Sequence, residues 1–115
     1  MKTTMKITKK TTSDKLIINL SFKEEREVYT IIILCSVAAY FMQDHEITIN
    51  DYSIFIDDKV VATIENTSII LERTLISNDT MVFIGIQTYL NIYFNLYDTN
   101  QYNKIETFYE ELKKK

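Results

Sequence analysis

The feature that most constrains this chain is its shortage of glycine and proline: one glycine, Gly85, and no proline in 115 residues. These two residues normally mark turns and loops, so the turns here must be built from other residues. The same shortage excludes phosphate-binding loops that depend on glycine, because such loops need backbone positions without a Cβ. Walker-type and dinucleotide-binding functions are therefore excluded.

The rest of the composition points to an unusual source. Isoleucine, asparagine, lysine, threonine and tyrosine are abundant, and all five have A/T-rich codons. We interpret part of this bias as an A/T-rich genome, and we expect a virus, another mobile element or a Firmicute. Because isoleucine and tyrosine favour strands, the same bias inflates the apparent strand propensity of the chain.

Length and apolar content set the class of protein. We expect residues 1–115 to form a single domain, since a second domain would be too small to hold its own core. Cys35 is the only cysteine and lies in an apolar run, so we expect a buried, inert thiol without a disulfide. No signal peptide is recognisable, and the longest apolar run, residues 30–42, is too short to span a bilayer. These features predict a cytoplasmic protein without a membrane partner.

Charge is unevenly distributed along the chain. Residues 1–15 hold five lysines against one aspartate, whereas residues 43–79 hold eight acidic residues against two basic ones. A nucleic-acid binder usually carries a basic stripe through its folded part, but here the basic residues lie at the ends. Nucleic acid is therefore not the expected partner. The acidic segment is suited to a protein partner with a basic surface.

The first half of the chain predicts a hairpin followed by a helix. Residues 5–9 and 15–22 are β-branched segments on either side of a polar connection, which indicates an opening hairpin. Ser21 and Glu24 fit a capping box at a helix start. The apolar residues that follow recur at helical spacing on more than one side, which predicts a central buried helix over about 22–43.

Further elements are predicted downstream of this helix. Residues 46–56 and 59–64 read as two strands joined at Asp57-Asp58, because acidic residues tolerate the left-handed conformations of a tight hairpin turn. An amphipathic stripe predicts a C-terminal helix over about 99–114, with closing lysines that suit the helix dipole.

The segment between these elements fits two structures. Residues 68–76 and 80–86 can form a hairpin, but apolar residues of 80–98 also fit helical spacing. Strand propensity favours the hairpin, whereas length and a cap at Asp79 favour the helix. We predict strands for at least 68–86. The resulting fold class is α+β, an antiparallel sheet of about four to six strands packed by the central and C-terminal helices.

Residues suited to catalysis are scarce. His45 is the only histidine, and Cys35 is the wrong partner for it because about 15 Å of helical rise would separate them. One histidine and one cysteine cannot supply the usual zinc ligands. Asp51, Asp57 and Asp58 could share a sheet edge and hold a divalent ion, but a hairpin turn explains the last two without metal. We predict no catalytic residue, no metal, no cofactor and no enzymatic activity.

Aromatic residues are the best candidates for binding. Tyr89, Tyr93 and Tyr97 share one face whether their segment is a helix or a strand. No basic residue lies between positions 80 and 103, so base stacking is not expected. Tyrosine is well suited to protein interfaces because it buries a large area at low entropic cost. The predicted partner-binding residues are these tyrosines together with Asp51, Asp57 and Asp58.

The sequence leaves three functional hypotheses. The first is a small non-enzymatic protein-binding module, an inhibitor or antagonist of the immunity, antitoxin or anti-defence type from a virus or mobile element. The second is a small-molecule or nucleotide-binding module with an aromatic-lined pocket. The third is a homodimer assembled through residues 68–97.

Overall fold

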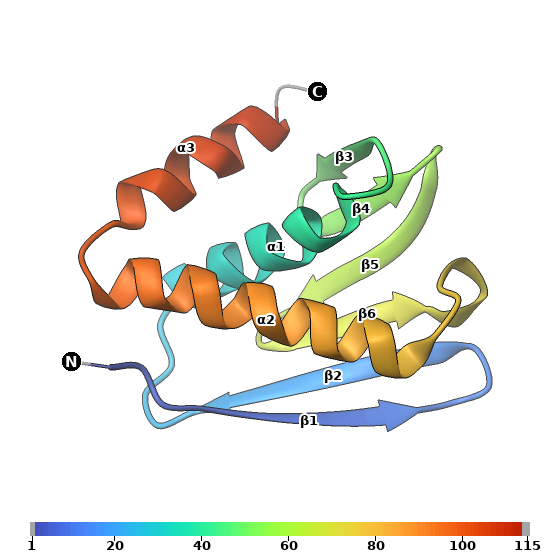
Figure 1. Cartoon of the computed structure of the whole chain (residues 1–115), viewed down its shortest axis with the longest axis horizontal. Coiled ribbons are helices and arrows are strands. Elements are labelled where there is room, and N and C mark those ends of the chain that lie inside the picture. Colours follow the sequence, from blue (N-terminus) through green and yellow to red (C-terminus); the bar gives the residue numbers. More distant parts are fainter. Residues whose placement is uncertain (1, 114–115) are drawn as a thin grey trace.

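The computed structural model describes residues 2–113 and contains six strands and three α-helices (Figure 1). In chain order these are β1 (Met5–Thr11), β2 (Lys15–Phe22), α1 (Val28–Phe41), β3 (Ile47–Asn50), β4 (Ser53–Ile56), β5 (Lys59–Glu65), β6 (Ser68–Glu72), the 3₁₀ helix η1 (Arg73–Leu75), α2 (Asp79–Asp98) and α3 (Tyr102–Lys113). The predicted α+β class is confirmed.

All six strands form one antiparallel sheet in the order β1-β2-β6-β5-β4-β3. The opening hairpin joins the later strands through β2 and β6, where Ile18 lies opposite Ile69. Alternate residues of these strands point to the helical side and are buried, as in a sheet covered on one face. The sheet therefore depends on a pairing between segments about fifty residues apart.

Aspartate and asparagine build the tight turns that glycine would usually form. The three connections β3–β4, β4–β5 and β5–β6 have two residues each. Positive φ angles occur at Asp51 (54°), Asp57 (49°), Asp58 (65°) and Asn66 (55°). These short polar side chains are the ones that best tolerate the left-handed region after glycine. The predicted turn at Asp57-Asp58 is confirmed.

The three helices lie on one face of the sheet, and α1 contacts both α2 and α3 (Figure 1). The seven residues from Ile32 to Ala38 are all buried, which confirms the central buried helix. Its predicted start near residue 22 was wrong. Ser21 lies in β2 opposite Lys6, so the sheet uses the backbone groups that a capping box would have satisfied. The helix begins at Val28 instead.

The prediction of strands through residue 86 was wrong beyond Glu72. The chain forms η1 after β6 and then enters α2, whose N-cap is Asn78; its side chain accepts a hydrogen bond from the Met81 amide at 3.1 Å. Burial of one helical face outweighs the strand propensity of the segment, because this face covers the sheet beside α1. The buried residues of this face are Val82, Ile86, Leu90 and Phe94.

Two other predicted boundaries also differ. Residues 46–56 are not one strand, because Asp51 turns the chain and divides the segment into β3 and β4. The C-terminal helix starts at Tyr102 rather than near 99, since Thr99 is the C-cap of α2 and Asn100 follows it with a φ of 61°. Its predicted end at residue 114 lies outside the described residues.

Candidate functional site

The three predicted tyrosines lie together on α2, as their spacing required. Tyr93 stacks on Phe108 of α3 with ring centres 6.0 Å apart and on Tyr89 at 6.4 Å. Tyr97 meets Tyr102 edge-on at 6.1 Å. All three α2 tyrosines are half-buried, and burial raises the pKa of the Tyr93 phenol. Their rings therefore form the seam between α2 and α3, and only part of each ring faces solvent.

The three predicted aspartates do not form one site. Asp51 lies in the β3–β4 turn, whereas Asp57 and Asp58 lie in the β4–β5 turn at the other end of β4. All three are exposed, and within residues 2–113 no group of three or more His, Cys, Asp or Glu side chains could hold a metal ion. The positive φ of each residue already explains why aspartate occupies the turn.

Cys35 and His45 occupy opposite environments. The Cys35 thiol is fully buried 3.9 Å from the Ile105 carbonyl oxygen, and burial raises its pKa to about 12. The buried position that the sequence predicted for this thiol is confirmed. His45 is exposed after the end of α1, where its backbone N–H donates to the Phe41 carbonyl. The thiol is therefore poorly suited to nucleophilic chemistry, which requires an accessible thiolate.

The solvent side of α2 is the most unusual surface among the described residues. From Thr80 to Tyr97 the helix has no charged residue, yet Met81, Ile84 and Ile92 are 66%, 57% and 50% exposed. Solvent-facing sides of helices usually carry charged residues, and charge depletion marks the centres of protein interfaces. We call this surface the outer α2 face. It consists of Met81, Ile84, Thr88, Asn91, Ile92 and Asn95, all of which are exposed.

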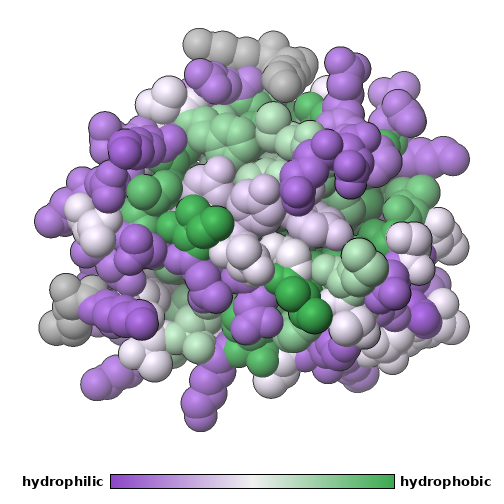
Figure 2. Space-filling view, in the orientation of Figure 1, coloured by the Kyte–Doolittle hydropathy of each residue, from purple (hydrophilic) through white to green (hydrophobic). Residues whose placement is uncertain are grey.

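Figure 2 views the helical side of the molecule, where exposed apolar side chains alternate with polar ones. Thr88 lies at the middle of the outer α2 face, and its hydroxyl donates to the Ile84 carbonyl at 2.9 Å. This face was not predicted from the sequence, because the sequence favours the tyrosines of the segment, on the opposite side of the helix, as the candidates for binding. The signal available in the sequence was the lack of any charged residue from position 80 to 97.

Two hollows flank the N-terminal segment that precedes β1. Thr3 anchors this segment by donating its amide to Asp98 Oδ2 at 2.8 Å and its hydroxyl to Oδ1 at 2.5 Å. The hollows have volumes of about 470 and 530 Å³. The smaller one has aromatic walls and a rim of mixed charge, with Arg26 donating to the Tyr97 hydroxyl at 3.0 Å. Its lining includes three aromatic, three basic and two acidic residues: Phe22, Tyr29, Tyr97, Lys2, Lys23, Arg26, Glu24 and Asp98.

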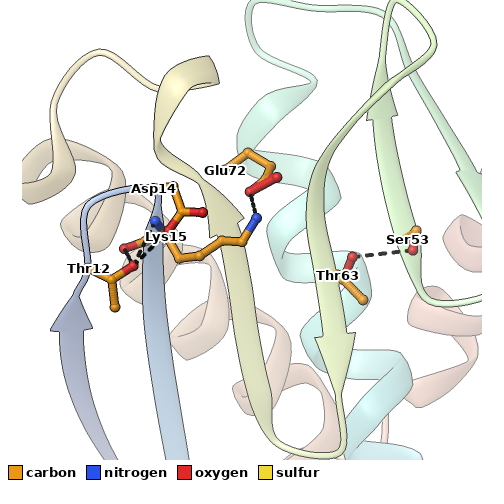
Figure 3. Close-up of polar contacts among 6 residues, drawn as sticks. All are labelled: Thr12, Asp14, Lys15, Ser53, Thr63 and Glu72. Atoms are coloured by element: carbon orange, nitrogen blue, oxygen red, sulfur yellow. Dashed lines mark hydrogen bonds and ion pairs between the residues drawn. The ribbon is translucent and has the colours of Figure 1, made fainter.

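The sheet face opposite the helices is mainly polar. Figure 3 views this face, with the Lys15 ammonium bonded to Glu72 across β2 and β6, and the Ser53 and Thr63 hydroxyls 3.4 Å apart. The hydrogen bond to Glu72 raises the pKa of Lys15. A solvated face of this kind is ordinary for an antiparallel sheet, so it does not indicate a binding site.

Within residues 2–113, none of the helices combines the length and apolarity that crossing a membrane requires. The chain matches no protein-family model, no curated protein and no solved structure.

Proposed function

We propose that this protein is a small non-enzymatic protein-binding module of the inhibitor or antagonist type, encoded by a virus or mobile element and acting in the cytoplasm. The observation that carries the proposal is the outer α2 face. On this face Met81, Ile84 and Ile92 are each at least half exposed. The helix that carries them has no charged residue from Thr80 to Tyr97. Exposed apolar residues grouped in this way mark interaction surfaces.

The distribution of charge supports a protein partner. The acidic residues of the β3–β5 region lie in exposed turns and strand ends, as Asp51, Asp57, Asp58 and Glu65 illustrate. The sheet order puts this acidic region toward the β3 edge, whereas α2 meets the opposite edge, where the Lys9 ammonium of β1 lies over the Phe83 ring. A partner that meets both surfaces would therefore need an apolar patch for α2 and a separate basic area for the acidic turns. Charge complementarity of this kind mainly accelerates and orients association, whereas the apolar contact supplies most of the affinity.

A small-molecule module is the second candidate, and the aromatic hollow at the N-terminal segment, which three basic and two acidic residues line, favours it. Its volume of about 470 Å³ lies within the range of ligand sites. An organic anion would raise the melting temperature of the protein if this hollow binds it. Arg26→Ala should then remove the shift, whereas Lys104→Ala should leave it intact, because Lys104 does not line the hollow.

The proposed function is tested by photo-crosslinking in the cells that encode the chain. A photoreactive residue at position 84 should form a covalent adduct with a different protein. The matched position is Thr107, an exposed residue on α3, where the same photoreactive residue should not yield this adduct. Loss of the adduct when Met81 is replaced by glutamate would place the contact on the outer α2 face. Identical adducts from positions 84 and 107, or none from 84, would refute the proposal.

A further inference from the structure

Strand β1 forms one edge of the sheet, and no other strand among residues 2–113 pairs with its outer side (Figure 1). Antiparallel strands alternate between residues that bond to the neighbouring strand and residues whose backbone groups point the other way. The Leu20 N–H donates to the Thr67 carbonyl at 3.0 Å, on the side away from β1, so Ile7, opposite Leu20, directs its own N–H and C=O outward. The same alternation places the backbone groups of three further residues at the open edge: Met5, Lys9 and Thr11.

The β1 edge lacks most of the features that prevent an edge strand from pairing again. Such features are a short length, a bulge, a proline or lysines. β1 is seven residues long without proline and runs in unbroken register with β2, whereas β3 at the other edge has four residues. Lysines are therefore its only protection. They repel another β1, but they attract a strand that carries carboxylates.

The lysines of β1 lie on both faces of the sheet. Lys6 and Lys10 share the polar face because an even number of residues separates them. Lys9 lies on the helical face, where its ammonium is 5.2 Å from the centre of the Phe83 ring. All three lysines are exposed, and β1 contains no acidic residue. A strand added along β1 would thus meet positive charge on both faces.

Helix α2 lies over the same edge, and the surface between the two elements is partly open. Met5 and Ile7 on the helical face of β1 are half-buried, as is Phe83 of α2. The hollow of about 530 Å³ lies between the start of β1 and the second half of α2, with Met5 and Phe94 in its lining. An added strand would cover part of this apolar surface. Side chains that alternate between apolar and acidic therefore suit the two faces of the edge.

We propose that β1 binds an extended, acidic segment of a partner protein, which adds to the sheet beside β1. The backbone of this segment pairs with the outward groups of β1, its carboxylates meet Lys6 and Lys10, and its apolar side chains pack toward α2. Strand addition of this kind draws affinity from main-chain hydrogen bonds and specificity from alternate side chains. The site lies on a different element from the outer α2 face, so this inference goes beyond the proposed function and does not depend on it.

A peptide strand fits this edge better than the other common anionic polymer, nucleic acid. The edge presents both N–H donors and C=O acceptors, and a peptide backbone satisfies both, whereas phosphate oxygens only accept. Sites for single-stranded nucleic acid also provide aromatic rings on which bases stack. β1 itself carries no aromatic residue.

Fluorescence anisotropy tests the charge requirement with a labelled peptide of about eight alternating glutamate and valine residues. The chain should bind this peptide at about 0.15 M salt and should not bind the counterpart with lysine in place of glutamate. Lys6→Glu and Lys10→Glu should each weaken binding about threefold or more, because an attractive pair becomes repulsive. Lys104→Glu makes the same change at an exposed position of α3 and should leave binding unchanged. Circular dichroism establishes that each variant is folded.

Backbone methylation of the peptide separates strand addition from simple charge attraction. Two peptides of the same sequence carry N-methyl groups on the amides of either the glutamates or the valines. Side-chain face and amide direction alternate together along a strand, so only one of these two sets of amides can point at β1. One methylated peptide should therefore lose binding, and the other should retain it. Equal binding of both peptides, or loss of both, would refute strand addition.

Other occupants of the edge would give different results. A single-stranded oligonucleotide that binds as tightly as the acidic peptide, and is lost in Lys6→Glu, would overturn the inference in favour of nucleic acid. Self-association of the chain alone that Lys6→Glu abolishes would assign the edge to a second copy. Absence of peptide binding would also refute the site on β1, whereas an adduct from position 84 would still support the proposed function.

Discussion

Gly85 of α2 packs directly against the ring of Tyr40 on α1: a Cβ at position 85 would lie 2.1 Å from Tyr40 Cε1 and 2.6 Å from Cδ1. The only glycine of the chain thus lies inside a helix, where glycine costs about 1 kcal/mol relative to alanine. Glycine is needed here for steric reasons, because the missing side chain lets α1 and α2 approach closely. The aromatic ring takes the space of the missing side chain.

Gly85→Ala is expected to destabilise the protein by about 1–2 kcal/mol, because the cost of overpacking exceeds the gain in helix propensity. Urea unfolding at neutral pH measures this change. In a Tyr40→Leu background the contact is relieved, and Gly85→Ala should then be neutral or stabilising. A gain in stability from Gly85→Ala in the unmodified chain would contradict the close packing of α1 and α2.

Asp58→Gly is expected to stabilise the β4–β5 hairpin by about 0.5–1 kcal/mol. The φ of 65° at this residue is strained for a side chain with a Cβ and free for glycine. Asp58→Ala keeps the Cβ and loses the carboxylate, so it should destabilise. Thermal unfolding of the two variants separates the effect of the backbone conformation on stability from the effect of the carboxylate charge. If both variants changed stability equally, the carboxylate rather than the backbone would govern the turn.

Asp98→Ala is expected to release the N-terminal segment from the end of α2. It removes the acceptor of two hydrogen bonds from Thr3, so the loss should be about 1–3 kcal/mol. Hydrogen exchange should show loss of protection at the Thr3 amide and little change in the sheet. Thr3→Val, which removes only the hydroxyl bond, should have a smaller effect. Equal exchange at Thr3 before and after Asp98→Ala would show that the carboxylate does not anchor the segment.

Alkaline pH is expected to destabilise the fold through Cys35. Burial raises the pKa of this thiol in the folded chain from the ordinary 9.0 to about 12. Stability is thus fully present below pH 9 and falls as pH rises toward 12, because only the unfolded chain gains from forming the thiolate. The slope contributed by Cys35 approaches about 1.4 kcal/mol per pH unit. Half-buried tyrosines add to it, since partial burial also raises the pKa of Tyr40 and Tyr93.

Urea unfolding between pH 8.5 and 10 measures this slope. In this pH range the thiol of the unfolded chain ionises before most of its tyrosines do. Cys35→Ala should reduce the slope while lowering stability uniformly through the small cavity that it leaves. An unchanged slope in Cys35→Ala would show that the thiol is not the group that responds.

Local sequence determined the elements whose signals agree with one another. The first hairpin, the buried central helix and the turn at Asp57-Asp58 were predicted because periodicity and turn chemistry point the same way in each. The buried state of Cys35 followed from its place in the apolar run. The outer α2 face could also have been recognised from spacing and charge, but only once its segment was known to be helical.

Tertiary structure decided the segments whose local signals conflict. Residues 80–86 have strand propensity but form a helix, because α2 covers the sheet beside α1 and its Gly85 admits the Tyr40 ring. Ser21 resembles a helix cap but lies in β2 opposite Lys6. Composition and periodicity thus determined the α+β class. Which side of α2 faces solvent was decided by long-range packing, since burial depends on neighbours that local sequence does not contain.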